Sequence, residues 1–329
     1  MARPSGGVAL VLSAFVLACG GPKSNTPTAP TTPSNLLWTV SGSLVSSVTG
    51  GSVAGATIVI ISDGSTFTSD SNGAFTIGAS VIPATPMRIS IIAPGYIRRD
   101  TFLQGGATRS GVVIDLIRDA APFSSTFYRE LVRGLADGSS LGTTRRWQQD
   151  PSFYIQTIDE TNASVPQPFI DTTRSIIPDI VRDVTAGRFQ ASRIETGPDA
   201  TVPAGSILIK FPSASFGSAG RASGVGVNPC TVQVWQGDVP SGVPLVIAHE
   251  IAHCLGLSHI TVTGLPPQEA GLMGKFGFGT WKQPRLTDAE RFHAAILYSR
   301  PVGNADPDVD PATWLFGNAA SSARTAWVR

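Results

Sequence analysis

The chain has 329 residues, which is enough for two domains of ordinary size, and 42% of them are hydrophobic while only 14% are charged. With 35 glycines and 25 prolines, this composition is typical of a folded, loop-rich protein and excludes a disordered one. The formal net charge is only +1, and without a basic surface we expect no nucleic-acid partner.

Residues 1–19 have the pattern of an export signal. Arg3 gives a positive start, and the apolar run "VALVLSAFVLA" (8–18) is too short to span a bilayer comfortably. The run ends at Cys19 and resembles a bacterial lipobox, although Leu17 stands where that motif prefers a smaller residue. The resemblance implies a lipid anchor on Cys19 that holds the protein on the cell envelope (on the outer membrane in a Gram-negative cell); plain secretion is the alternative. Both interpretations place the protein outside the cytoplasm.

The segment after Cys19 predicts a tether followed by a β domain. Residues 20–35 are rich in proline, threonine and serine and have little to bury. Residues 36–118 show short β-branched runs separated by turn residues, which favours a small antiparallel β-sandwich. The clearest runs are "TIVIIS" (57–62), "AFTIG" (74–78) and "RISIIA" (88–93).

The same β region is similar to the carboxypeptidase regulatory-like family of transthyretin-type sandwiches. The matching stretches are "VSGSL" (40–44), "VAGATIVI" (53–60), "SDSNGAFTI" (69–77) and "APGY" (93–96). This resemblance implies a non-catalytic accessory module.

From residue 119 to 302 the pattern becomes mixed, and residues 303–329 are expected to form a tail of open role. Helices are expected within 122–136, 171–189 and 287–298, strands within 145–158, 206–212 and 231–236, and a loop over 213–226. Pro178 is expected in the first turns of its helix, and Thr287 with Glu290 forms a capping box. The predicted fold is therefore multidomain, with an N-terminal all-β sandwich and a C-terminal α+β domain.

Three of the four histidines lie in "HEIAHCLGLSH" (249–259), within an apolar stretch that predicts a helix. Residues four apart project from one helical face, so His249 and His253 are placed to hold one zinc ion. Glu250 lies beside the first ligand and is a candidate general base. Gly256 permits a sharp turn that brings His259 back as a third ligand. With this chain's own frequencies, a chance match to the full motif is on the order of one in a million.

At these residues the chain resembles the metzincin clan of zinc metalloendopeptidases. The resemblance implies a zincin-like domain, one catalytic zinc on the three histidines, Glu250 as the base and a Met-turn at Met273, in "EAGLMGKFG" (269–277). Lys275 stands where astacins and serralysins have a tyrosine, so the domain resembles a minimal, matrixin-like form. Any calcium requirement stays open, as does the oligomeric state.

The two remaining cysteines, Cys230 and Cys254, allow several interpretations. In an oxidising compartment they can form a disulfide, and each can also be a buried free thiol. Cys254 could instead ligate the metal, although a helix turns it about 100° away from His253.

The predicted function is that of an exported zinc-dependent endopeptidase acting on a protein or peptide. The metzincin resemblance implies that "SILIKF" (206–211) is an edge strand that pairs with an extended substrate. One alternative is a gluzincin-type site, in which Glu290 replaces His259 as the third ligand. Another is a tethered binding or adhesion protein with a vestigial zinc site. His293 is interpreted as a surface or packing residue.

Overall fold

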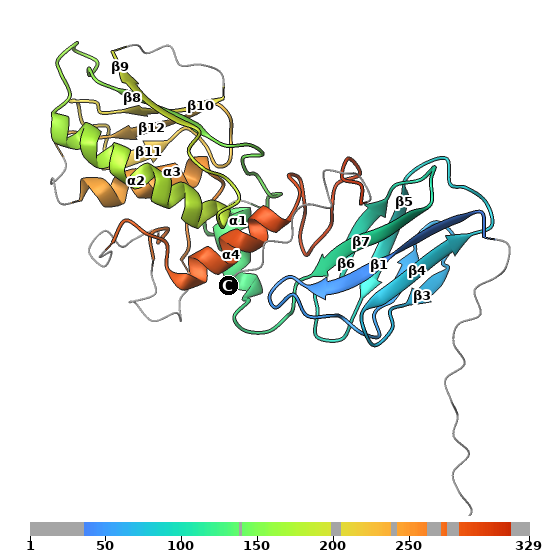
Figure 1. The fold of residues 1–329 in the computed structure, drawn as a ribbon. Helices are drawn as coiled ribbons and strands as arrows, with labels where there is room; N and C mark the ends of the chain where they lie inside the picture. The colour runs from blue at the N-terminus through green and yellow to red at the C-terminus, as the bar shows by residue number, and fades with distance from the viewer. Residues whose placement is uncertain are drawn as a thin grey trace, which may run out of the picture. The chain divides into compact units, whose positions relative to one another are not determined.

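The computed structural model describes residues 36–137, 140–198, 205–237, 242–261, 271–274 and 283–316, and these form one compact unit. The predicted signal peptide, Cys19, the tether and Lys275 lie outside the described residues. In coarse terms the protein is α+β, with more strands than helices among the described residues (Figure 1).

Residues 38–116 form two sheets, which together are called the two-sheet region below. Their strands are β1 (Trp38–Ser46), β2 (Thr57–Ile60), β3 (Thr66–Thr68), β4 (Ala74–Ala79), β5 (Met87–Ile92), β6 (Arg99–Leu103) and β7 (Arg109–Leu116). One sheet has the order β4-β1-β7 and the other β3-β2-β5-β6. Alternate side chains from both sheets form one apolar core that includes Trp38, Ile58 and Ile89. The expectation of purely antiparallel pairing was wrong, because β1 and β7 run parallel.

Residues 125–299 form a five-stranded sheet with helices, called the helical region below (Figure 1). Its elements are α1 (Ser125–Arg133), the 3-10 turn η1 (Leu135–Asp137), β8 (Ser152–Gln156), α2 (Gln167–Thr185), β9 (Arg193–Gly197), β10 (Ser206–Lys210), β11 (Gly220–Ala222), β12 (Cys230–Val234), α3 (Val243–Cys254) and α4 (Asp288–Ser299). The strand order is β11-β12-β10-β8-β9, and all neighbours run parallel except β11 with β12. Helix α3 packs against α2, β11 and β12.

Three sequence expectations in this region need correction. Strand β10, which contains "SILIK", lies in the centre of the sheet between β12 and β8, so it cannot be an edge strand. The edge beside α3 is β11, which lies within the stretch expected to be a loop. Helix α2 begins at Gln167, so Pro178 lies in its interior and not in its first turns. The capping box of Thr287 and Glu290 is confirmed.

The segment after α4 returns to the two-sheet region. The amide of Asp310 donates to the carbonyl of Asp100, and the amide of Phe316 donates to that of Phe102, so this segment runs along edge strand β6. The Phe316 side chain joins the apolar core between the two sheets. Residues 303–316 are thus an integral part of the fold and link its two regions.

A closed ring of buried polar side chains holds residues 303–310 against the two-sheet region, and it is called the charge ring below. Its members are Arg99, Asp115, Arg300, Asn304, Asp308 and Asp310. Asp115 binds both arginines, each arginine binds one further aspartate, and Asn304 donates to both of those aspartates. Burial alone would raise the pKa of Asp115, but the charges of Arg300 and Arg99 hold that pKa well below its ordinary value.

His293 on α4 is buried and packs against Phe127, so it is a packing residue and not a surface one. Its Nδ1 lies 2.7 Å from the carbonyl of Ala289, and the amide of Ser124 donates to its Nε2 over 3.0 Å. An imidazole that donates from one nitrogen and accepts at the other must be neutral. Burial accordingly lowers the pKa of His293 to about 4.

The lowered pKa of His293 predicts a specific acid sensitivity. Between about pH 6.5 and pH 4, His293 binds a proton in the unfolded chain but stays neutral in the folded chain. The free energy of unfolding therefore falls as the pH falls through that window. We expect the free energy of unfolding to drop by about 2–3 kcal/mol more between pH 7 and pH 4.5 in the wild type than in His293→Leu. Urea unfolding of both proteins at the two pH values measures this difference, and equal drops would contradict the assignment.

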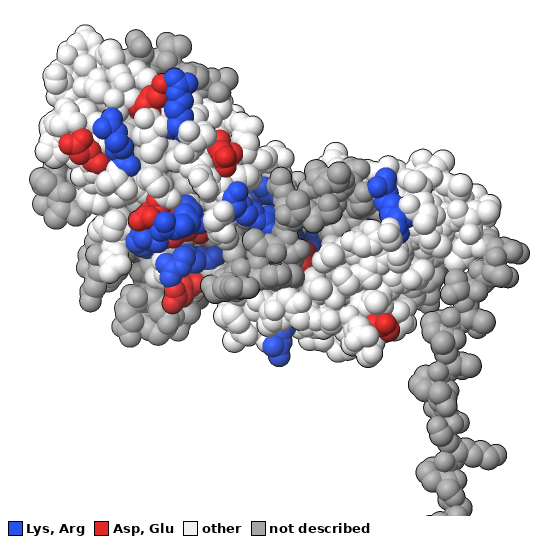
Figure 2. All heavy atoms as spheres, in the orientation of Figure 1, with Lys and Arg blue, Asp and Glu red and all other residues white. Residues whose placement is uncertain are grey.

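Only 14% of the residues in the chain are charged. On the face drawn in Figure 2, the described basic and acidic side chains lie beside one another and form no patch of one sign. Among the described residues, none of the helices combines the length and the apolar character needed to cross a bilayer.

Candidate metal centre

Helix α3 carries two of the predicted ligands and is buried on almost all sides, which explains why its sequence is apolar all round. Pro244 lies in its first turn, where a missing amide hydrogen costs nothing. At its other end, the indole of Trp147 donates to the carbonyl of Cys254 and the hydroxyl of Tyr298 donates to that of Leu255. These side chains satisfy carbonyls that the end of a helix leaves without partners.

Gly256 produces the bend that follows α3. Its φ of +116° lies in the region that favours glycine, and a Cβ there would lie 2.3 Å from the carbonyl oxygen of Arg145. Beyond the bend, the amide of Ser258 donates to the carbonyl of Leu131 in α1. The turn and this anchor lead the chain back toward α3, so His259 reaches the other two histidines as the motif predicts.

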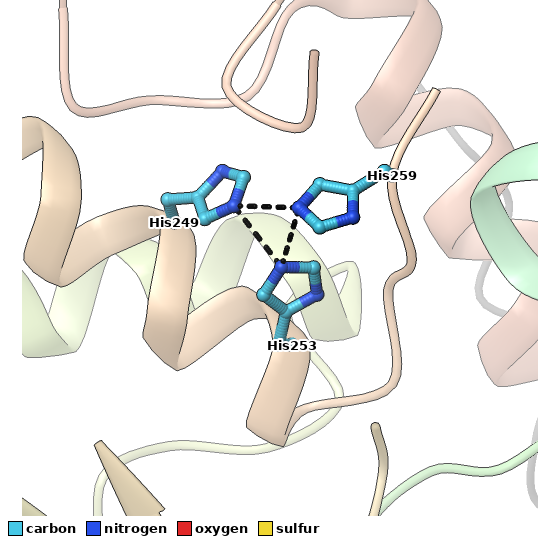
Figure 3. A group of neighbouring side chains, drawn as sticks. All are labelled: His249, His253 and His259. Carbon is cyan, nitrogen blue, oxygen red and sulfur yellow. Dashed lines mark hydrogen bonds between the residues drawn. The ribbon is translucent and has the colours of Figure 1, made fainter. Parts of the chain in front are cut away.

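The three predicted ligands converge through one nitrogen each, as Figure 3 shows. The Nε2 atoms of His249 and His253 lie 3.0 Å apart, and each lies 3.2 Å from Nε2 of His259. His249 and His253 are buried, whereas His259 is partly exposed.

Backbone carbonyls determine the tautomers of the two helical histidines. Nδ1 of His249 lies 2.6 Å from the carbonyl oxygen of Leu272, and Nδ1 of His253 lies 2.7 Å from that of Leu257. Each Nδ1 must therefore carry the hydrogen, which directs the lone pair of each Nε2 toward the centre of the triangle. Burial and, second, the neighbouring His253 lower the pKa of His249 well below its ordinary value. The His249 ring therefore stays neutral, and its Nε2 lone pair faces that of His253.

This donor set fits a divalent metal ion. Tetrahedral zinc with nitrogen ligands at about 2.0–2.1 Å separates neighbouring ligands by roughly 3.3 Å, close to the distances between these nitrogens. Outer hydrogen bonds from Nδ1 to carbonyls are also typical of histidine ligands. Imidazole ligands suit zinc and several other first-row metals, so the geometry fits a metal ion but does not specify which one.

Glu250 lies on α3 beside the ligands and is itself buried. Strand β11 passes so close that a Cβ on Gly220 would lie 2.8 Å from Oε1 of Glu250 and 2.4 Å from Cγ1 of Val246. Glycine at this position therefore makes room for the carboxylate between helix and strand. Burial raises the pKa of the Glu250 carboxyl to about 8, which makes it a stronger base than an exposed glutamate.

The backbone of residues 271–274 forms hydrogen bonds with His249 and with the residue that follows His259. Besides the Leu272 carbonyl on His249, the carbonyl of Met273 accepts a hydrogen bond from the amide of Ile260, which follows His259. Ile260 and Gly274 form a parallel bridge. The Met273 side chain is fully buried in the apolar core. This short segment thus contacts His249 directly and the residue after His259, which is the place where Met273 was predicted to lie.

The structure resolves the alternatives for the two cysteines. Cys230 and Cys254 form a disulfide, with their Cα atoms 5.8 Å apart. Cys254 is therefore not a metal ligand. The bond joins the start of β12 to the last turn of α3 and so ties the helix that carries the ligands to the sheet.

Glu290 is not placed as a third ligand. Its carboxylate is fully buried and accepts hydrogen bonds from Thr287 and from the amides of Leu272 and Met273. Among the described residues, the one cluster of three or more potential ligands is His249, His253 and His259. Sequence reasoning predicted that the three histidines come together, but it missed the contact between Glu290 and residues 271–274. The sequence marked Glu290 only as a member of the capping box.

No family model and no curated protein matches the chain. A solved cohesin–X–dockerin complex from Acetivibrio cellulolyticus matches with a TM-score of 0.21 and 20% identity over 24% of this chain, which spans 56% of that structure's length. The pilus 2b backbone protein of group B streptococcus matches with a TM-score of 0.20 and 11% sequence identity. The match covers 25% of this chain and 41% of the pilus protein. Metalloproteinase-II from Bacteroides fragilis matches with a TM-score of 0.33 and 14% sequence identity. The match covers 73% of this chain and 90% of the metalloproteinase. These scores are too low to establish a shared fold.

Proposed function

We propose that the protein is a zinc-dependent endopeptidase with a zincin-like catalytic domain. The observation that carries the proposal is the convergence of three imidazole nitrogens at 3.0–3.2 Å beside a buried glutamate on the same helix. His249, His253 and His259 would hold the ion, which supplies Lewis acidity toward a carbonyl oxygen and toward water.

Glu250 acts as the general base in this proposal. Its buried carboxylate takes the proton of the attacking water and then delivers it to the nitrogen of the leaving amine. The Nδ1 hydrogen bonds to the carbonyls of Leu272 and Leu257 keep the two helical imidazoles oriented while the proton moves.

Strand β11 is the candidate for aligning the substrate. It is an edge strand of its sheet and lies directly against Glu250. An extended peptide can add to such an edge through backbone hydrogen bonds, which would present its carbonyl groups to the site in register. Backbone pairing is largely independent of sequence, so this arrangement favours proteins or peptides as the substrate class.

We also propose that the enzyme works outside the cytoplasm and that residues 36–118 form a non-catalytic β-sandwich. The disulfide between Cys230 and Cys254 supports export, because disulfides persist mainly in oxidising compartments. The export pattern at the N-terminus, with Cys19 as the lipid attachment site, agrees with this location.

Removal of the metal tests the proposal. We expect the purified protein to bind one zinc ion and to cleave a proteome-derived peptide library, and we expect a chelator to stop cleavage and added zinc to restore it. Mass spectrometry of the digest and metal analysis of the protein are the measurements. One bound zinc without any cleavage would instead support a binding protein with a vestigial site, and cleavage that survives removal of the metal would contradict the mechanism.

A further inference from the structure

We propose that Glu290 on helix α4 is a positioning residue for the metal site, acting through the backbone of residues 271–274. This inference rests on the proposed function, because it concerns how the same three histidines are held. Glu290 does not touch the ligands. Its role follows from a chain of hydrogen bonds that joins α4 to His249 and to the residue after His259.

The first link is the set of donors around the Glu290 carboxylate. Oε1 accepts from the amide of Met273 at 2.7 Å, and Oε2 accepts from the amide of Leu272 at 3.2 Å. Oε2 also accepts from the amide and the hydroxyl of Thr287, at 2.8 and 3.0 Å. A carboxylate that receives four donors at a fully buried position is held in one orientation.

The second link is the backbone that this carboxylate holds. The two residues whose amides it binds turn their carbonyls toward the site: that of Leu272 accepts from Nδ1 of His249, and that of Met273 accepts from the amide of Ile260. A shift of residues 271–274 would therefore move the carbonyl that orients His249, and it would also move Ile260, the residue after His259. Outer partners of this kind typically change metal affinity by about 10–100-fold when they are lost.

Gly271 provides an independent observation for the same contact. A Cβ at this position would lie 2.1 Å from Oε2 of Glu290 and 2.4 Å from its Cδ. Its φ lies outside the left-handed region, so conformational freedom does not explain the glycine. What the position requires is the absence of a side chain, so that the carboxylate can reach the amides of the next two residues.

A purely local role for Glu290 is the competing explanation. Glu290 completes the capping box of α4 with Thr287, so its loss would destabilise the helix whether or not it supports the metal site. The two roles separate because Thr287 belongs to the cap and supplies two of the four donors to the Glu290 carboxylate, whereas Gly271 has no part in the cap and borders that carboxylate from the side of the Met273 segment.

The test compares zinc affinity and stability in three variants of the full chain. Glu290→Gln keeps the size of the side chain but turns an NH₂ group toward backbone amides. Gly271→Ala places a Cβ against the Glu290 carboxylate. Thr287→Ala removes the capping hydroxyl, and with it one donor to Oε2, but leaves the amides of Leu272 and Met273 to bind the carboxylate. Zinc dissociation constants are measured by competition with a chelator, and melting temperatures are measured without metal. We expect Glu290→Gln and Gly271→Ala to weaken zinc binding by about 10–100-fold, and Thr287→Ala to change it by less than about threefold while lowering the melting temperature.

The outcomes are distinct. Glu290→Gln and Gly271→Ala proteins that bind zinc as tightly as Thr287→Ala would overturn the inference and leave Glu290 as a capping residue. If Glu290→Gln fails to fold, Gly271→Ala decides by the same comparison, since it keeps both capping residues and the carboxylate charge. A wild-type protein that binds no zinc would refute the proposed function itself, and this is measured before any variant is compared.

Discussion

Replacing Glu250 with glutamine is expected to lower kcat for peptide hydrolysis by about 10²–10⁴-fold while the protein still binds one zinc ion. Glutamine keeps the shape that fits between α3 and β11, where Gly220 leaves space for it. It cannot accept and return a proton, however, so only the base is removed. Steady-state kinetics on a cleaved peptide, with metal analysis of the same preparation, measure both quantities.

The matched control for this prediction is His259→Ala. This variant removes one of the three converging nitrogens and is expected to lose zinc together with activity. Loss of hydrolysis with zinc retained in Glu250→Gln, but with zinc lost in His259→Ala, assigns separate roles to the two residues. A Glu250→Gln enzyme with a near-normal kcat would rule out Glu250 as the base.

The parts of the metal site that depend on local spacing follow from the sequence. His249 and His253 share a face because a helix brings residues four apart together, and the bend at Gly256 follows from the positive φ that glycine accepts. The carbonyls that orient the two rings could not be predicted in this way. Leu272 lies 23 residues from His249, and the register of such a contact depends on packing.

The fold shows the same division. Apolar periodicity located α3, α4 and the central strands, but β9 is polar and β11 has only three residues within a glycine- and serine-rich stretch. Such short edge strands are defined by the neighbour they pair with and not by their own composition. Pro178 was misplaced because residues 171–175 are polar, so the apolar pattern is clear only from Ile176 and gave no signal for the actual start at Gln167.

The largest difference between expectation and structure concerns the residues after α4. The acidic stretch "DPDVD" (306–310) is too short and irregular to predict a site, yet Asp308 and Asp310 are buried members of the charge ring. Their arginine partners come from both regions of the fold, with Arg300 bound to Asp115 across 185 positions of the chain. Pairings over such separations leave no local signal. They also argue against a freely separable N-terminal module, since the two regions share buried charges.

Replacing Arg300 with methionine is therefore expected to lower the free energy of unfolding by about 3–5 kcal/mol. Arg300 is fully buried and binds Asp308 through two nitrogens, at 2.7 and 2.8 Å, and Asp115 at 2.5 Å. Methionine fills much of the same volume but leaves two buried carboxylates without their main counter-charge. The cost arises from those stranded charges and not from a missing contact alone.

Arg129→Met is the matched control for that prediction. Arg129 also pairs with an aspartate through two nitrogens, but its side chain is 38% exposed and that of its partner Asp306 is 23% exposed. Water stabilises charges that remain near the surface, so this variant is expected to cost less than about 1 kcal/mol. Urea unfolding monitored by tryptophan fluorescence and by circular dichroism measures both variants. Equal costs would show that the charge ring adds nothing beyond an ordinary surface ion pair, whereas a large cost for Arg300→Met in one transition common to both probes would show that the two regions unfold together.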